Sequence, residues 1–404
     1  MITSNELATK RDSGTAVSTA AVPRNGRQII STASPDVLEI ALVDVPVVAP
    51  KSDQVVVRIE AAPINPSDLI ILLGAAAGNL AEARFGGTPQ RPCVQIPLGS
   101  GARQAMARRI GLPLPVGQEG AGHVVSAGSD VAHLLGQNVA VQSPRAGLFA
   151  EYQTVAAADC VVLAPTTTPE QAASMFVNPL TALAMVETLH LDGAEALIHT
   201  AAASQLGQML VKICAEDGVP LVNVVRSAEQ VDLLRGLGAR YVCDSSRTTF
   251  GEDLLAAVTA TGATVAFEAI GGGAIAGELL SAMEAAAVAR SRHPSPFGSF
   301  QRKHVYVYGH LDDSPTVLQH GDFGLLWGVS GWLMPTILDR IGPQRAASLR
   351  ERIISHLDTT FHTSYAARIT LAEALHQDVM TRYTAQSTAG KYLITAPDRP
   401  VVAE

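Results

Sequence analysis

Between residues 196 and 309 the sequence alternates short apolar runs with stretches of helical periodicity, and this alternation restricts the possible folds strongly. The apolar positions Met209, Leu210 and Ile213 recur at helical spacing between the first two runs. Strands that alternate with helices in this way pair in parallel and form a doubly wound sheet. The sequence therefore predicts an α/β domain with a parallel sheet. Its five strands are expected at residues 196–199, 221–225, 241–244, 264–269 and 305–309.

Small residues follow the first predicted strand and lead into a helix that contains Gly207. A strand, a tight turn and a helix hold a dinucleotide pyrophosphate at the helix N-terminus, because the backbone itself must approach the phosphates. Ala202 and Ser204 stand where two of the three glycines of this fingerprint are expected. The turn therefore predicts a nucleotide site, and an ordinary packing turn between strand and helix is the alternative interpretation.

The end of the second predicted strand carries Arg226 and Ser227, and no acidic residue occurs before Glu229. About twenty residues beyond such a turn, a carboxylate binds the ribose of NAD, whereas an arginine suits the 2′-phosphate of NADP. This pattern favours NADPH as the cofactor. The alternative is that Arg226 is a solvated surface charge.

The chain of 404 residues is long for a single core, so two domains are expected. Hydrophobic residues make up 47% of it and charged residues 16%, a composition that argues against a disordered chain. The net charge of −8 is spread along the sequence without a basic stripe. We therefore expect no nucleic acid as a partner.

The four cysteines lie far apart and form no CxxC pair, which favours reduced thiols over a disulfide scaffold or a zinc ribbon. Residues 1–27 are polar and predict a flexible extension without a signal peptide. No segment reaches the roughly eighteen apolar residues that a membrane span requires. The sequence thus predicts a cytoplasmic protein with no membrane partner.

The first 165 residues are rich in alternating patterns and predict a partly open, mostly antiparallel barrel or sandwich. Residues 74–114 contain several glycines and prolines and are expected to form a mobile or elaborated loop. Ser67 or Asp68 could cap a helix near residues 69–73, and Thr168 with Pro169 marks a further helix start. Helices are expected at 172–177 and 180–189, with Asn178-Pro179 between them, and at 346–356 and 371–383; a final strand at 390–394 is expected to return to the first domain.

The order of these motifs resembles the medium-chain dehydrogenase/reductase superfamily from about Gln28 to Pro397, and most closely its zinc-free quinone oxidoreductase and enoyl thioester reductase branches. The resemblance implies a GroES-like, mostly antiparallel catalytic domain over residues 28–175, to which 345–404 return. It also implies a Rossmann domain over residues 176–344, with the substrate between the two. The matching stretches are 56–59 leading into 64–68, 117–125, 147–152, 178–182, 201–207 and 390–391.

By the same resemblance, Thr181 is expected near the nicotinamide and Asn65 near the substrate, and these are the predicted catalytic residues. The alternative for Thr181 is that it caps the helix expected at 180–189. Asp68 is expected to hold the loop rather than to act as an acid. His310 follows the fifth strand and is either a proton relay or a loop histidine. The aromatic stretch 327–332 suggests a homodimer. The predicted cofactor-binding residues are Thr181, Ala203, Ser204, Gln205, Leu206, Gly207, Arg226, Ser227, Tyr308 and His310.

Where zinc-dependent members carry a cysteine and a His-Glu pair, this chain has residues 65–68 and Gln118-Glu119, so no metal is expected. Without a metal ion, simple alcohol oxidation lacks its Lewis acid. We therefore expect an NADPH-dependent, zinc-free reductase that transfers a hydride to a quinone or an α,β-unsaturated carbonyl. One alternative is an enoyl thioester reductase, for which Arg103, Arg108 and Arg109 could form a cationic groove. The other is a non-catalytic NADPH-binding protein.

Overall fold

The computed structural model describes residues 17–18, 22–143, 145–291, 295–319, 322–385 and 390–396. It divides into two compact units, 1–174 with 365–404 and 175–364. Residues 345–364, which the sequence analysis assigned to the first domain, fall in the second unit. Most of the predicted extension lies outside the described residues. Within it, however, β1 (Val17–Ser18) and the start of β2 (Asn25–Ala33) are paired strands, so residues 25–27 are not loose.

The first unit consists mainly of antiparallel strands, as predicted. Among the described residues, one sheet has eight strands in the order β11-β9-β8-β4-β19-β18, with β1 on β8 and β10 on β4. These strands are β4 (Gln54–Pro63), β8 (Glu119–Ala127), β9 (Asn138–Gln142), β10 (Tyr152–Ala156), β11 (Cys160–Val162), β18 (Tyr365–Ile369) and β19 (Lys391–Thr395). The second sheet, β5-β6-β3-β2-β7, contains β3 (Val37–Pro46), β5 (Arg84–Thr88), β6 (Arg91–Pro97) and β7 (Pro113–Pro115).

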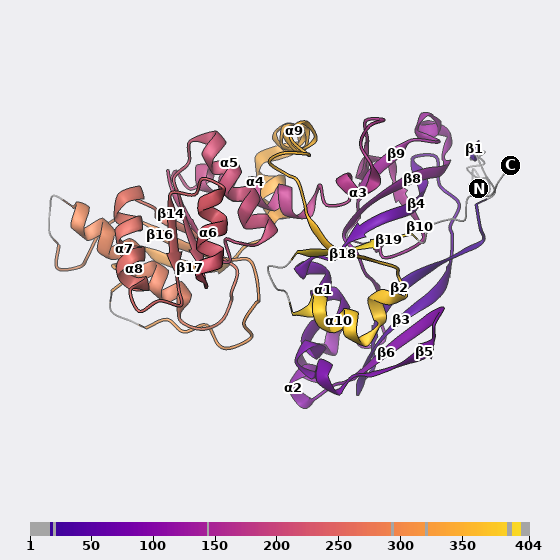
Figure 1. Cartoon of the computed structure of the whole chain (residues 1–404), viewed down its shortest axis with the longest axis horizontal. Coiled ribbons are helices and arrows are strands. Elements are labelled where there is room, and N and C mark those ends of the chain that lie inside the picture. Colours follow the sequence, from indigo (N-terminus) through magenta and orange to yellow (C-terminus); the bar gives the residue numbers. More distant parts are fainter. Residues whose placement is uncertain are drawn as a thin grey trace, which may run out of the picture. The chain divides into compact units, whose positions relative to one another are not determined.

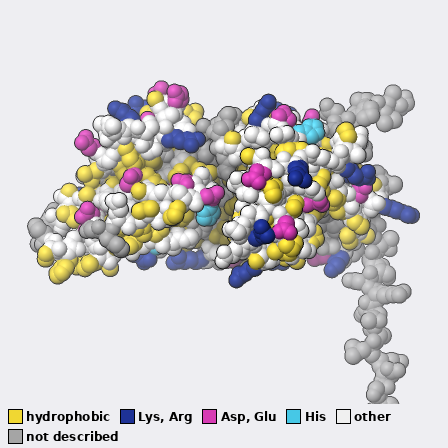
Figure 2. Space-filling model, turned by 90° about the horizontal axis from the view of Figure 1, so that it is seen from below, with side chains coloured by type: hydrophobic (Ala, Val, Ile, Leu, Met, Phe, Trp, Pro, Cys, Tyr) yellow, Lys and Arg dark blue, Asp and Glu magenta, His cyan; other side chains and the backbone are white. Residues whose placement is uncertain are grey.

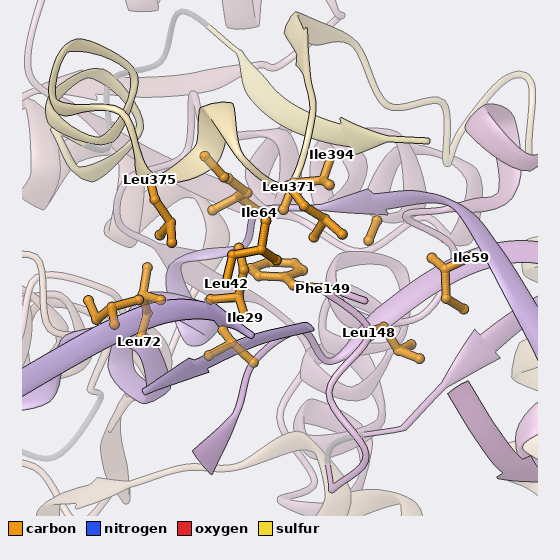
Figure 3. Packing of buried hydrophobic residues seen from close by; sticks show 14 of the residues in the cluster. Ile29, Leu42, Ile59, Ile64, Leu72, Leu148, Phe149, Leu371, Leu375 and Ile394 are labelled. Carbon is orange, nitrogen blue, oxygen red and sulfur yellow. The ribbon is translucent and has the colours of Figure 1, made fainter. Parts of the chain in front are cut away.

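The core of the first unit combines residues from both ends of the chain. Alternation along β2 and β3 turns Ile29 and Leu42 inward, where they lie with Ile64 around the ring of Phe149 (Figure 3). Ile394 of β19 joins the same cluster. β19 pairs antiparallel with β4, which confirms that the last strand returns to the first domain.

The prediction of a loop over residues 74–114 was wrong. This segment forms η1 (Gly74–Glu82), β5, β6, α2 (Ser100–Ala105), η2 (Ala107–Arg109) and β7. The alternation in β6 buries Val94 and Ile96 in the core, although the surrounding glycines and prolines are typical of turns. Short elements between turn residues therefore add three strands, β5, β6 and β7, to the second sheet. The remaining short elements of this unit are α1 (Pro66–Leu72), η3 (Ser129–Leu134), η4 (Ala157–Asp159), α3 (Pro169–Ala172), η5 (Glu373–Leu375) and α10 (Gln377–Thr384).

The second unit is a doubly wound parallel sheet in the order β14-β13-β12-β15-β16-β17. The five predicted strands are present as β12 (Leu197–His199), β13 (Leu221–Val225), β14 (Tyr241–Asp244), β15 (Val265–Glu268) and β16 (Lys303–Val307). The sixth strand, β17 (Trp327–Gly331), lies in the aromatic stretch and was not predicted as a strand. The fold class is thus confirmed. The helices are α4 (Val177–Leu191), α5 (Gln205–Asp217), α6 (Ala228–Gly236), α7 (Phe250–Thr261), α8 (Ile275–Arg290) and α9 (Met334–Ser355).

Helices α7 and α8 pack side by side, and their apolar residues share one core with the strands of the sheet (Figure 1). Asn178-Pro179 does not separate two helices as predicted but lies in the first turn of α4, where a proline costs little because its missing N–H has no helical partner. One stretch, Pro169–Leu191, is long and apolar enough to pass a length-and-composition test for a membrane span. Its apolar window is 83% buried inside the fold, as in a core helix that passes the same test.

Candidate functional site

The turn after β12 is built around a close approach of the helix to the strand end. Ser204 caps α5, since its Oγ accepts a hydrogen bond from the N–H of Gly207 at 3.1 Å. A Cβ atom on Gly207 would lie 2.1 Å from the carbonyl oxygen of Ala202, so this position requires glycine. Ala201 adopts the left-handed region with φ of 50°, a conformation that stores strain in a residue with a side chain. Of the three glycines of the fingerprint, this turn therefore requires only the last one, at Gly207.

The same turn leaves hydrogen-bond donors without partners. The described residues supply no acceptor for the backbone N–H groups of Ala203, Gln205 or Leu206. Free N–H groups at a helix N-terminus, together with the helix dipole, form a site for an anion such as a phosphate. These three residues are among the predicted cofactor contacts, and the geometry is suited to that role.

Arg226 and Ser227 follow β13, where a cofactor ribose is expected. Arg226 is exposed, and its guanidinium group forms no ion pair or hydrogen bond with a described residue. Its backbone N–H donates to Oε1 of Gln230. Ser227 caps α6, and its hydrogen bond to the Glu229 carboxylate lowers the pKa of that group. A cation without a partner at this strand end can bind a 2′-phosphate.

Buried polar residues follow the neighbouring strands of the same sheet. His199 is completely buried, and its Nε2 lies 2.7 Å from the hydroxyl of Tyr308. Burial lowers the pKa of His199 to about 3, so the ring is neutral, and burial raises the pKa of Tyr308. Tyr308 is thus fixed by a neutral histidine, whereas the predicted contact His310 is exposed.

Glu268 at the end of β15 organises the adjacent loop. Its carboxylate accepts hydrogen bonds from the N–H groups of Ile270 and Gly271, and burial raises its pKa. Thr200 bridges the strands, because its hydroxyl accepts from the N–H of Ala269 at 2.8 Å and lies 3.4 Å from Glu268. The sequence analysis missed His199 and Glu268. Polar residues at the carboxyl ends of predicted parallel strands were the signal that could have identified them.

Thr181 lies within α4, and its hydroxyl donates to the carbonyl oxygen of Val177 one turn earlier. It therefore does not cap the helix. The predicted contact with the nicotinamide stays a prediction.

Asn65 belongs to the first unit, where it starts α1 inside a buried network. Its N–H donates to Oδ2 of Asp68 at 2.8 Å, and the N–H of Gln118 donates to Oδ1 of Asp68 at 3.0 Å. The Asn65 amide contacts two further side chains, because Nδ2 donates to Glu119 at 3.0 Å and Oδ1 accepts from Nζ of Lys391 at 2.7 Å. Asp68 thus ties two loops together, in line with its expected role.

The network is closed to solvent, with Asp68 and Glu119 fully buried and Asn65 1% exposed. The pKa of Asp68 is raised to about 7, chiefly by burial and also by the negative charge of Glu119, although the Asn65 N–H group and the Lys391 charge act in the opposite direction. Asp68 can therefore hold a proton near neutral pH. The sequence analysis did not single out Lys391, which appeared only as part of a motif.

Ser67 lies between these residues, and its Oγ is buried without a hydrogen-bond partner among the described residues. A buried hydroxyl without a partner is costly unless a ligand or water completes it. The sequence identified Ser67 only as a possible helix cap. The structure indicates a free donor on this loop.

The residues that stand where zinc-dependent members of the superfamily carry their metal ligands do not fit a divalent cation. Asn65 replaces a thiolate there, and the Lys391 ammonium donates to its amide oxygen, so a second cation would meet like charge. Within the part of the chain that the structure describes, no group of three or more His, Cys, Asp or Glu residues converges.

On the face of the molecule that Figure 2 shows, basic, acidic and apolar side chains are interspersed.

Part of the chain matches a known protein family, and several known proteins are similar to it. Residues 51–166 match the family model of the alcohol dehydrogenase GroES-like domain. The mitochondrial enoyl-[acyl-carrier-protein] reductase of Bos taurus is 28% identical over 245 residues, which are 59% of this chain and 57% of that protein. A quinone oxidoreductase of Pseudomonas aeruginosa is 30% identical over 163 residues, 40% of this chain and 50% of that protein.

Two solved structures show the same fold over nearly the whole chain. A putative NADPH:quinone reductase from Mesorhizobium loti has a TM-score of 0.70 at 23% identity and covers 93% of this chain and 100% of its own. A mutant enoyl thioester reductase from Candida tropicalis has a TM-score of 0.63 at 19% identity and covers 92% and 100%. The chain belongs to the medium-chain dehydrogenase/reductase superfamily. Within it, the chain lies on the branch of the quinone oxidoreductases and enoyl reductases, and it spans about half the length of the curated relatives it matches.

Proposed function

We propose that this protein is an NADPH-dependent reductase that needs no zinc and acts on a quinone or an α,β-unsaturated carbonyl compound. One observation carries the proposal: the unpartnered N–H groups at the start of α5 and the unpartnered Arg226 follow two neighbouring parallel strands, β12 and β13. Together they match a pyrophosphate and a 2′-phosphate. Relatives named as enoyl reductases and quinone oxidoreductases support the reaction class.

NADPH, when bound, supplies the hydride. The turn residues Ala203, Gln205 and Leu206 would bind its pyrophosphate, Arg226 its 2′-phosphate, and Tyr308 would line the site in an orientation fixed by His199. These residues would position the cofactor.

In the first unit, Ser67 would donate a hydrogen bond to the substrate oxygen on which negative charge develops, because its hydroxyl lacks a partner among the described residues. Asp68 would hold a proton near neutral pH for the reduced product, since burial raises its pKa to about 7. Asn65 would position this loop rather than contact the substrate. Its amide is engaged on both sides.

An enoyl thioester is the second candidate substrate, and the names of several relatives favour it. The predicted cationic groove does not favour it, because two of the three arginines are occupied. Arg103 pairs with Asp36 at 2.9 Å, and Arg109 donates to the main-chain oxygens of Ile70 and Ile71. Arg108 alone is exposed without a partner among the described residues.

The proposal is tested by titrating NADPH and NADH into the wild type, Arg226→Ala and the control Arg302→Ala. Arg302 is exposed and precedes β16 at the opposite end of the sheet. Losing a charge-assisted hydrogen bond should weaken NADPH about tenfold to a hundredfold in Arg226→Ala. NADH and the control should be unaffected. Equal, weak binding of both cofactors in all three proteins would contradict the proposal.

A panel of quinones, enones and enoyl thioesters then separates the substrates, with NADPH oxidation as the measurement. Oxidation with quinones or enones alone supports the first candidate, and oxidation with thioesters supports the second. NADPH binding without oxidation by any acceptor would favour a non-catalytic binding protein.

We also propose a homodimer that forms through β17. This strand ends the sheet of the second unit among the described residues, and Ser330 and Gly331 are exposed. A free strand edge offers unpaired backbone groups to a second copy. Sedimentation at micromolar concentration should show a dimer, and a monomer there would rule the proposal out.

A further inference from the structure

Lys391 begins β19 and carries its ammonium group into the interior of the first unit. The residue is 8% exposed, and its Nζ donates to the amide oxygen of Asn65 at 2.7 Å. Two buried carboxyl groups, Asp68 and Glu119, belong to the same cluster. A buried charge persists only with opposite charge and hydrogen bonds around it, so the ammonium and the carboxyl groups depend on one another.

The neighbours of Asn65 determine how its amide is oriented. A lysine ammonium can only donate hydrogen bonds, so the amide oxygen must face Lys391. An ionised carboxylate can only accept, so the amide nitrogen must face Glu119. If the positive charge is lost, only Glu119 still fixes this orientation. Lys391 and Glu119 together thereby set the orientation of the residue that starts α1, two positions before Ser67.

Charge links the same residues. Burial lowers the pKa of Lys391, whereas the negative charges of Glu119 and Asp68 act in the opposite direction. The Lys391 charge in turn opposes the rise in the pKa of Asp68. The lysine and the two carboxyl groups thus stabilise one another's charged forms, whereas the two carboxyl groups repel each other.

We propose that Lys391 is the resident cation of this cluster: its ammonium group supplies the positive charge with which Glu119 and Asp68 are buried, and it orients the Asn65 amide. Lys391 is a positioning residue, since it acts through Asn65 on the loop that carries Ser67. The charge coupling does not depend on the reaction. Only the predicted effect on turnover rests on the proposed function.

The first experiment separates charge from hydrogen bonding. Lys391→Gln keeps an N–H donor without the charge, and Lys391→Met keeps the length of the side chain without either. Urea unfolding of both should show the folding equilibrium constant reduced about a hundredfold or more, because each leaves carboxylates buried without a cation. The control Lys51→Met removes an exposed lysine of the same unit and should change nothing. Wild-type stability of Lys391→Gln would overturn the proposal.

A double-mutant cycle then tests whether Glu119 is the charge partner of Lys391. In the Lys391→Met background, Glu119→Gln removes the unbalanced negative charge and keeps an acceptor for Asn65. The folding equilibrium constant of the double variant should therefore be at least about tenfold higher than that of Lys391→Met. Independent, additive effects of the two changes would overturn the proposal. If Lys391→Met does not fold, Lys391→Gln and the double variant provide the same comparison.

Two further measurements distinguish positioning from a purely structural role. The charged groups that act on Asp68 are Glu119 of β8 and Lys391 of β19, and Glu119 in turn acts on Tyr365 of β18. Without the cation, the pH-dependent stability change linked to Asp68 should move to higher pH. With an acceptor that the wild type reduces, Lys391→Gln should lower kcat and leave NADPH affinity unchanged; unchanged kcat would overturn the positioning role.

These readouts keep the two proposals apart. If the wild type reduces no acceptor, the proposed function fails and the charge coupling is still measured by unfolding. If turnover is normal but the cycle shows no coupling, the inference about Lys391 fails alone.

Discussion

The two units treat their polar groups in opposite ways. Around Asn65 in the first unit, the main donors and acceptors satisfy one another, and the amide is bonded on both sides. At the start of α5 in the second unit, three N–H groups and the guanidinium of Arg226 have no partner among the described residues. A saturated network fixes a geometry, whereas unused hydrogen-bonding capacity is what a ligand site requires. The first network is thus suited to fixing a loop, and the free groups of the second unit are suited to the proposed cofactor.

The units also differ in how burial affects their titratable groups. Burial raises the pKa of Asp68 to about 7 and lowers the pKa of His199 to about 3. The cause is the same, since low polarity disfavours the charged form of either group. The consequences for stability against pH are opposite, which allows the two units to be compared in one experiment.

The largest expected effect concerns the turn of the second unit. Gly207→Ala would place a Cβ atom 2.1 Å from the Ala202 carbonyl oxygen, so the strand end or the helix must shift. We expect a stability loss of about 4 kcal/mol or more and no measurable NADPH binding. The control Gly251→Ala lies in α7 with no atom within 4 Å and should be neutral or stabilising. Denaturant unfolding and NADPH titration measure both. Full NADPH affinity in Gly207→Ala would show that the turn does not bind the pyrophosphate.

The second prediction concerns Asp68. Its folded-state pKa lies above its unfolded value, so the native state holds the proton more tightly and stability falls as the pH rises from about 4 to about 7. Between about pH 5 and about pH 7 the loss should approach 3 kcal/mol, at about 1.4 kcal/mol for each pKa unit. Asp68→Asn should remove this slope, whereas the exposed control Asp53→Asn should retain it. Unfolding curves at several pH values test this, and an unchanged slope in Asp68→Asn would exclude Asp68 as its source.

The third prediction is the opposite slope in the second unit. His199 has a folded pKa below its unfolded value, so stability is lost as the pH falls from about 6.5 towards 3. Between about pH 6.5 and about pH 5 the loss should be about 2 kcal/mol. His199→Gln can keep a hydrogen bond to Tyr308 and should reduce the slope. The control His190→Gln replaces an exposed histidine. If both variants keep the wild-type acid sensitivity, another group is responsible.

The sequence predicted the second unit better than the first, and the reason is physical. Parallel strands buried on both faces appear as continuous apolar runs, so β12 to β16 were identified. β17 was not, because its Trp, Gly and Ser residues lack that pattern. In the segment 74–114, short strands such as β6 lie between glycines and prolines, and only tertiary pairing with β3 shows them to be strands.

The residues of the candidate sites also differ in how well the sequence predicts them. The turn and its glycine at 207 could be predicted, because they depend on neighbours in the sequence, whereas the cap by Ser204 was not predicted. Lys391 could not be predicted, since it reaches Asn65 across 326 positions of the chain. His199 and Glu268 are likewise paired with residues that follow other strands, 109 positions away for His199 and 68 for Glu268. Sequence spacing does not predict these pairs, although the positions of His199 and Glu268 at the ends of predicted strands mark both residues as candidates.

The smallest effect tests whether the strain at Ala201 is part of the binding turn. Ala201→Gly removes the cost of a left-handed alanine, about 1 kcal/mol or slightly more, but it adds about 0.5–1 kcal/mol of chain entropy in the unfolded state. Stability should therefore rise by less than about 1 kcal/mol. The control Ala194→Gly precedes β12 without a positive φ and should lose about 0.5–1 kcal/mol. NADPH affinity shows whether the strain contributes to cofactor binding. If it falls in Ala201→Gly while stability rises, the alanine holds the free N–H groups in place for the ligand; unchanged affinity would show that the conformation only completes the turn.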